Sequence, residues 1–356
     1  MNCEKPGANP PEKPGAKPLA LEEVPFLPTK QAKVAGSRVS GPTNRQTRLH
    51  KGAKPPYVPP RPDICDITRR LTDRDRAILR ALGRHRVFAS PQLTAMFFDS
   101  QKRSLWRLLE LYRMGALDRF QPYRPGWGAY PYHYVLGRLG ASVVAAGTKA
   151  DANAASRRWR PDRGLALGCP ERLTWLVGLN GLCAALVAHA RRHPGTRLAD
   201  WMTEAEVRRW VDRIVSPHAY FEWCQDGTSM EFFVEWDRQE TAESLRIRLE
   251  HYAKLETDRA VSTWVLFAFP SPRREAAVRA ALTDATVPVA TATVSGDIGP
   301  NSAVWWPLAG AGRLRLVDLA RVPIPPESSA RVAKGSLRAW WYEGHKSRWP
   351  ERLYDW

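Results

Sequence analysis

The sequence predicts a mixed α+β protein with two globular parts behind an N-terminal arm. The chain has 356 residues, which is enough for two ordinary domains. Its hydrophobic fraction is 44% and it contains 15 tryptophans, so most of it can form packed cores. Helical patterns followed by two-residue alternation occur once before residue 150 and again after residue 170. These observations favour a small α+β domain followed by a mixed sheet flanked by helices.

Composition sets the boundaries of these parts. Residues 1–62 hold 13 of the 30 prolines and few bulky apolar side chains. Proline fixes φ and removes a hydrogen-bond donor, so this segment is predicted to be a disordered basic arm. We expect globular domains over 63–150 and 171–325, a polar linker over 151–170, and an aromatic segment over 326–356.

The positive charge is concentrated near the N-terminus. The net charge is +18, of which +7 lies in the arm and +8 in the domain that follows it. A basic arm joined to a basic domain is typical of proteins that bind polyanions, nucleic acid above all. The alternative is an arginine-rich protein whose charge only keeps it soluble.

Cysteine usage and hydropathy indicate a cytoplasmic protein. The five cysteines form no C-x-x-C pair, which argues against a zinc ribbon or a disulfide framework and favours reduced thiols. No apolar run reaches the roughly 18 residues of a membrane span, and the start lacks the apolar core of a signal peptide. We therefore expect no membrane partner.

Three short helices are predicted in the first domain. The first begins after Thr72, an N-cap residue, and the second begins at Ser90-Pro91. The third runs from Gln101 to Met114. Its predicted inner stripe consists of leucines and a tyrosine: Leu105, Leu108, Leu109 and Tyr112.

Two strands follow these helices. Residues 117–120 have the two-residue alternation of a strand, and residues 122–128 form a basic aromatic turn. Residues 130–136 form the second strand of the hairpin. This is the order of a winged helix-turn-helix, in which the third helix enters the major groove and the wing touches the backbone. The candidate groove residues are Gln101, Lys102, Arg103 and Arg107, and the candidate wing residues are Arg119, Arg124 and Trp127. Winged helices also serve as protein–protein modules.

The second domain is predicted to have the element order α-β-β-β-α-β. A helix over 171–193 precedes a strand near 197–201 and a hairpin over 217–238. An amphipathic helix then carries Leu245, Leu249 and Tyr252 on one side. The remaining predicted elements are a strand over 263–269, a helix over 273–282 and a strand over 287–294.

The hairpin carries the candidate chemistry. Asp226-Gly227 is a strong two-residue turn, and this register places Tyr220 opposite Phe233. His218, Glu235 and Asp237 then share one face, because side chains alternate along a strand. The other face is almost wholly apolar and is expected to be the core face: Ala219, Phe221, Trp223, Met230, Phe232, Val234 and Trp236. The same register sets Glu222 opposite Glu231, so these carboxylates lie near solvent or the register differs.

The second domain resembles the restriction-endonuclease-like PD-(D/E)XK nuclease fold. The whole arrangement over residues 68–290 resembles the replication-relaxation family of actinobacterial plasmids, mobile elements and phages. The motifs that carry this resemblance are Leu71-Thr72-Asp73-Arg74-Asp75, Leu136-Gly137-Arg138-Leu139-Gly140-Ala141 and Val234-Glu235-Trp236-Asp237-Arg238. The resemblance implies a role in replication or mobilisation of such an element.

The nuclease motif departs from its usual form. By position, His218 replaces the first carboxylate, Glu235 matches the acid of Glu-x-Lys, and Asp237 replaces the lysine. Such folds use carboxylates to hold Mg²⁺ at the scissile phosphate, and histidine suits Mn²⁺ better than Mg²⁺. One reading is a degenerate nuclease fold in a DNA-binding accessory protein without a cofactor. The alternatives are a nuclease or nickase that holds Mg²⁺ or Mn²⁺ on Glu235 and Asp237, and a winged-helix transcriptional regulator.

The C-terminal segment adds candidate partners. Residues 338–356 contain four tryptophans and two tyrosines. They either pack back on the sheet, bind a relaxase or replication protein, or stack on single-stranded bases. The sequence leaves a homodimer open.

Overall fold

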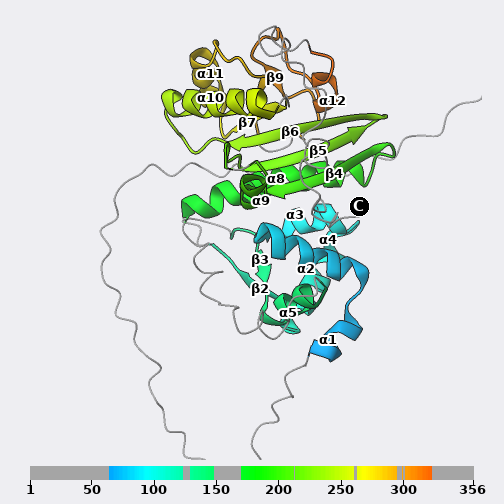
Figure 1. Ribbon diagram of the computed structural model, residues 1–356. Coiled ribbons are helices and arrows are strands. Elements are labelled where there is room, and N and C mark those ends of the chain that lie inside the picture. Colours follow the sequence, from blue (N-terminus) through cyan, green and yellow to red (C-terminus); the bar gives the residue numbers. More distant parts are fainter. Residues whose placement is uncertain are drawn as a thin grey trace, which may run out of the picture.

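The computed structural model describes residues 64–122, 129–147, 170–211, 213–259, 263–294, 299 and 301–322. Arg124 and Trp127, the N-terminal arm, most of the linker and the aromatic C-terminal segment lie outside the described residues. The fold is mixed α+β with one small antiparallel sheet and one larger mixed sheet, as the sequence predicts (Figure 1).

The N-terminal part contains five helices and three strands in the described residues. In chain order they are α1 (Ile64–Arg70), α2 (Asp73–His85), β1 (Val87–Ala89), α3 (Ser90–Phe97), α4 (Gln101–Arg113), β2 (Leu117–Phe120), β3 (His133–Leu136) and α5 (Arg138–Gly147). The three strands form an antiparallel sheet in the order β1-β3-β2. Thr72 caps α2 through a reciprocal capping box with Asp75, as its position before the helix predicts. The elements α1, β1 and α5 were not predicted.

The inner face of α4 differs from the predicted stripe. The buried residues of this helix are Ser104, Leu108 and Leu111, whereas Leu105 and Tyr112 are exposed. The Ser104 hydroxyl lies 2.7 Å from the Thr94 hydroxyl of α3, so a buried polar contact helps to set the rotation of the helix. The expectation that Leu105 and Tyr112 face the core was therefore wrong.

The C-terminal part is a six-stranded sheet with helices on both faces. Its elements are α8 (Pro170–Ala190), β4 (Thr196–Thr203), α9 (Glu204–Trp210), β5 (Ala219–Gln225), β6 (Thr228–Trp236), α10 (Ala242–Arg259), β7 (Trp264–Phe269), α11 (Pro272–Ala281), β8 (Val289–Thr293), β9 (Trp306–Pro307) and α12 (Leu316–Leu319). The strand order is β4-β5-β6-β7-β8-β9, with β6, β7 and β8 parallel to one another and the other neighbours antiparallel. The predicted order of helix, three strands, helix and strand is confirmed. Helix α9 occupies the stretch after the first strand, for which the sequence leaves a short helix or irregular structure open.

The hairpin register is confirmed. Tyr220 pairs with Phe233, and Glu222 pairs with Glu231. The turn residues Asp226 and Gly227 have φ values of 50° and 80°, which is the geometry of a tight hairpin turn with two left-handed residues. Glu222 is largely buried and accepts a hydrogen bond from the Ser229 hydroxyl, so it does not lie in solvent.

Both faces of this hairpin are covered, which corrects the expectation of a single core face. The predicted apolar face packs into the larger core, beneath α8. The opposite face also contributes to a core, because Tyr220 and Phe233 pack with Leu245, Leu249 and Tyr252 of α10. His218, Glu235 and Asp237 therefore lie in a buried layer and not on a solvated surface.

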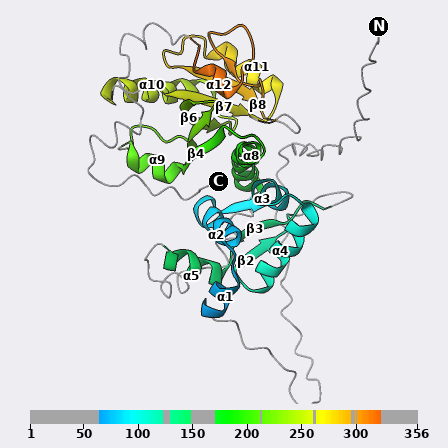
Figure 2. The ribbon, with the colours of Figure 1, turned by 90° about the vertical axis from the view of Figure 1, so that its right-hand side faces the viewer.

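Helix α8 joins the two parts. It lies between the small domain and the large sheet, where Figure 2 shows it nearly end-on. One hydrophobic cluster runs from α2 through α8 into the sheet. At Gly178 a Cβ atom would lie 2.3 Å from the Trp236 ring, so this helix requires glycine where it crosses the end of β6.

The same helix corrects the expectation of no long apolar run. Among the described residues, Arg172–Ala190 is long and apolar enough to cross a membrane by length and composition, and 56% of that window is buried in the fold. A helix packed between two layers is apolar on more than one side, which accounts for its composition.

Candidate functional site

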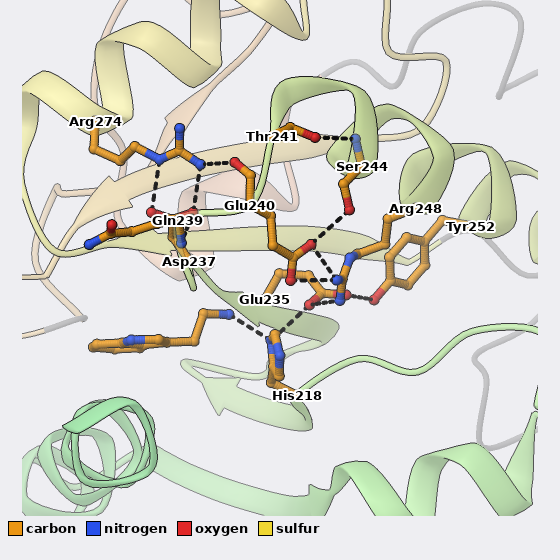
Figure 3. Close-up of polar contacts among 11 residues, drawn as sticks. His218, Glu235, Asp237, Gln239, Glu240, Thr241, Ser244, Arg248, Tyr252 and Arg274 are labelled. Carbon is orange, nitrogen blue, oxygen red and sulfur yellow. Dashed lines mark hydrogen bonds and ion pairs between the residues drawn. The ribbon is translucent and has the colours of Figure 1, made fainter. Parts of the chain in front are cut away.

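The predicted hairpin residue Glu235 lies at the centre of a buried polar network (Figure 3). Its carboxylate accepts a hydrogen bond from the Tyr252 hydroxyl at 2.6 Å and another from Arg248 Nη1 at 3.0 Å. His218 Nδ1 lies 2.8 Å from the same carboxylate and 3.0 Å from the Trp236 backbone nitrogen. Strand β6 thus supplies the acid, and α10 supplies two of its partners.

Asp237 lies just past the end of β6 and has a different partner. Arg274, at the start of α11, binds both of its carboxylate oxygens at 2.9 Å. The Gln239 backbone N–H donates to the same carboxylate at 3.1 Å. The Asp237 side chain is fully buried, so the bidentate guanidinium neutralises a charge that water does not reach.

Arg248 links the network to a third carboxylate. Its Nη2 contacts both oxygens of Glu240, at 2.6 and 2.7 Å, while its Nη1 contacts Glu235. Arg274 also donates to the Glu240 backbone carbonyl, which ties the two arginines to one turn of chain. In Figure 3 Arg274 and Arg248 lie on opposite sides of the Asp237 and Glu240 carboxylates.

The network determines the protonation of Glu235. Burial alone would raise the pKa of its carboxyl group, but His218, Arg248 and Tyr252 outweigh burial and hold the pKa below its usual value. The Tyr252 hydroxyl has a pKa raised well above its usual value, chiefly by burial and then by the adjacent carboxylate. Glu235 is therefore an ionised acceptor, and Tyr252 is a neutral donor at neutral pH.

These contacts leave little capacity for a metal ion. The oxygens of Glu235, Asp237 and Glu240 already accept from guanidinium or hydroxyl donors. A divalent cation on Glu235 and Asp237 would have to displace Arg248 and Arg274. Within the described residues, no group of three or more His, Cys, Asp or Glu side chains could hold a metal ion. The residues present do not fit the two-carboxylate site that the nuclease resemblance implies, because arginine and tyrosine donors occupy the carboxylate oxygens.

Lowering the pH is expected to destabilise the protein, because buried carboxylates such as that of Glu235 become protonated. The pKa values of Glu235, Glu275 and Asp75 are all lowered in the folded chain; burial opposes the shift, and arginine contacts contribute to it in each case. A lowered folded-state pKa gives stability that is present above the unfolded value and is lost as pH falls through the folded one. We expect the urea midpoint, followed by tryptophan fluorescence, to be flat from pH 7 to about 5 and to fall below about 4.5, the usual value for glutamate. A midpoint that stayed constant from pH 5 to 3 would contradict the assignment.

The second candidate region is the exposed side of α4. Gln101, Lys102 and Arg103 are exposed at the start of this helix, as expected of groove candidates. Neither Lys102 nor Arg103 makes an ion pair with the described residues. Arg107, also a predicted groove residue, instead binds Asp75 at 2.6 Å and contacts Glu110, so its donors serve the fold.

Arg119 of β2 lies beside this helix. Its guanidinium sits 4.7 Å from the centre of the Tyr112 ring and 4.0 Å from the centre of the Tyr132 ring. Both tyrosines are partly exposed. The predicted wing residue therefore joins α4 to the strand pair in one surface.

Sequence reasoning found the two acids but not their arginine partners. Arg248 falls in the predicted apolar stripe of α10, at the i, i+3, i+4, i+7 positions shared with Leu245, Leu249 and Tyr252. A charged residue within an apolar stripe signals a buried ion partner, so this residue was detectable. Arg274 gave no such signal, because its contact depends on the tertiary position of α11.

Comparison with known protein families identifies one match. The model of the family described as replication-relaxation matches residues 79–263, which is more than half of the chain. The chain belongs to the replication-relaxation family. No curated protein and no solved structure matches the chain.

The matched region contains both candidate sites. It extends from α2 to the residue before β7, so it includes the exposed side of α4 and the Glu235, Arg248 and Tyr252 contacts. Arg274 lies beyond it. Membership of the replication-relaxation family supports a role in the replication or relaxation of a plasmid or mobile element.

Proposed function

We propose that this replication-relaxation protein is a DNA-binding accessory factor that acts without nuclease chemistry of its own. The observation that carries the proposal is a contrast between the two regions. The cations at the start of α4 have no carboxylate partner among the described residues, whereas Glu235 and Asp237 are each bound by an arginine. The first arrangement suits a polyanion, and the second suits a scaffold.

The order of elements supports DNA binding by the N-terminal part. Elements α2, β1, α3, α4, β2 and β3 follow the sequence helix, strand, helix, helix, strand, strand of a winged helix-turn-helix. In that fold the helix equivalent to α4 lies in the major groove, and the connection between the last two strands touches the backbone. Lys102, Arg103 and Arg119 are then the described residues that contact phosphates or base edges.

The network around Glu235 supports a scaffold role for the large sheet. The sheet has the α-β-β-β-α-β order of nuclease-like folds, but its two acids are neutralised by Arg248 and Arg274. We propose that the fold is kept as a platform that α8 fixes to the DNA-binding part. The competing function is a metal-dependent nickase that uses Glu235 and Asp237.

Neutralising two cations of α4 tests the DNA-binding proposal. In the variant Lys102→Gln/Arg103→Gln we expect affinity for plasmid-derived duplex DNA to fall about tenfold or more at low salt. The slope of log Kd against log salt should fall by about 2, because each phosphate contact contributes about 0.9. Fluorescence anisotropy over a salt series measures both quantities.

The control is a variant that likewise loses two positive charges, on a helix far from α4 in the sequence. Arg208 and Arg209 are exposed on α9, a helix of the C-terminal part, so Arg208→Gln/Arg209→Gln should leave the affinity and the slope near those of the wild type. Equal losses in both variants would make the binding a net-charge effect and contradict the assigned surface. In a plasmid nicking assay with Mg²⁺ or Mn²⁺, open circles from the wild type but not from Glu235→Ala would favour the nickase instead.

A further inference from the structure

The exposed side of α4 is unusually apolar for a surface that meets only a DNA duplex. Among the described residues, five large hydrophobic side chains are exposed, and four of them lie on α4 or beside it. They are Leu105 at 42%, Trp106 at 66%, Tyr112 at 38% and Tyr132 at 37% exposure. These four residues are called the α4 aromatic face below.

The α4 aromatic face is continuous and carries positive charge. At 100° per residue, Leu105, Trp106 and Tyr112 fall within an arc of roughly 120° that lies outside the buried stripe, and Lys102 and Arg113 fall within the same arc. Lys102 and Arg113 are exposed and have no carboxylate partner among the described residues. Aromatic rings and cations without a carboxylate partner among the described residues therefore share one surface.

Arg119 extends this surface in a fixed geometry. Its guanidinium lies over the rings of Tyr112 and Tyr132, at 4.7 and 4.0 Å from their centres. It makes no ion pair with the described residues, so its charge remains available to an incoming anion. The two rings restrict its rotamers, which lowers the entropy that binding would cost.

We propose that the α4 aromatic face binds single-stranded DNA by stacking Trp106, Tyr112 and Tyr132 on unpaired bases. This inference rests on the proposed DNA-binding function and names the form of DNA that the surface prefers. A duplex presents polar base edges in its major groove and hides the flat faces of its bases. Unpaired bases expose those faces, and their phosphates lie within reach of Lys102, Arg113 and Arg119.

Charge favours nucleic acid over a second copy of this chain as the occupant. A self-complementary contact on this face would bring Lys102, Arg103, Arg113 and Arg119 against their own copies. Like charges at such an interface oppose association, whereas a phosphate backbone neutralises them. A protein partner is therefore an alternative outcome of the test and not the proposal.

The test compares the affinity of the protein for single-stranded DNA with its affinity for double-stranded DNA. Anisotropy is measured with a labelled oligothymidine and with a duplex of equal length, for the wild type, Trp106→Ala/Tyr112→Ala and Ile247→Ala. Ile247 is the fifth exposed hydrophobic residue and lies on α10, away from the α4 aromatic face, so it is the matched control. Equal urea midpoints for all three proteins establish that the folds are comparable.

We expect the double variant to bind oligothymidine about tenfold or more weakly, while duplex affinity changes less than about threefold and Ile247→Ala matches the wild type. Trp106→Phe should retain most of the single-strand affinity, because phenylalanine still stacks. Equal losses on both DNAs, or no loss on either, overturn the inference. So does a change in sedimentation of the double variant without a change in DNA binding, which would identify a protein interface.

The failure of the proposed function has a different signature. If Lys102→Gln/Arg103→Gln binds both DNAs like the wild type, the DNA-binding surface itself is elsewhere. If that variant loses duplex binding while Trp106→Ala/Tyr112→Ala binds oligothymidine normally, DNA binding stands and only the stacking inference fails.

Discussion

Replacing Trp201 with alanine is expected to lower the free energy of unfolding by about 3–5 kcal/mol, the range for removing a buried tryptophan. Trp201 lies on β4 and is only 2% exposed. Its ring stacks on the His85 ring at 3.5 Å and packs edge-on against Phe88 at 5.9 Å. Both neighbours belong to the N-terminal part, so this side chain fills the junction between that part and the large sheet.

Trp106→Ala is the matched control, because the same atoms are removed from a side chain that is 66% exposed. Its free energy of unfolding should stay within about 0.5 kcal/mol of the wild type. Urea unfolding followed by circular dichroism measures both variants. A Trp201→Ala protein as stable as Trp106→Ala would show that the junction contributes little and that the two parts fold independently.

Polar contacts also join the N-terminal part to the C-terminal part at this junction. Asn180 of α8 donates to the backbone carbonyls of His85 and Val87, at 3.1 and 2.7 Å. Nε of Arg84, on α2, donates to both carboxylate oxygens of Glu206, on α9, at 2.9 and 3.0 Å. These buried or half-buried contacts fix the orientation of the small domain on the sheet, so DNA bound at α4 would be held in a set position relative to the Glu235 network.

Local signals made much of the fold predictable. Thr72 begins a helix because its hydroxyl can cap the first turn, and Asp226-Gly227 forms a turn because both residues tolerate positive φ. The three-residue strand Val87–Ala89 has no periodicity to detect. The rotation of α4 was misjudged because leucines fit two adjacent stripes, and the deciding contact, between Ser104 and Thr94, lies between two helices.

The candidate site was predictable only in part, for a related reason. Strand alternation was enough to place His218 and Glu235 together, since the hairpin register follows from its turn. The charges that neutralise the acids come from α10 and α11, at sequence distances of 13 and 37 residues. Whether a carboxylate is free to hold a metal or is occupied by arginine depends on such tertiary contacts, and no short motif reports them.

Removing Arg274 should have the second large effect on stability. The variant Arg274→Ala leaves the Asp237 carboxylate fully buried, with the Gln239 backbone N–H as its one remaining donor among the described residues, so we expect a loss of about 3 kcal/mol in the free energy of unfolding. Arg273→Ala, the exposed neighbour on α11, should change the free energy of unfolding by less than about 0.5 kcal/mol. Urea midpoints at pH 7 measure both variants.

A double-mutant cycle separates a structural pair from a catalytic one. If Asp237 and Arg274 act as a structural pair, Asp237→Ala/Arg274→Ala should lose less stability than the two single variants combined, because neither charge is then left unpaired. A scaffold role requires this coupling together with unchanged DNA affinity, since the pair lies just past the end of β6 in the large sheet and not on α4. Additive losses, with metal-dependent nicking that disappears in either single variant, would instead mean that Asp237 contributes chemistry and that Arg274 only holds it in the absence of substrate.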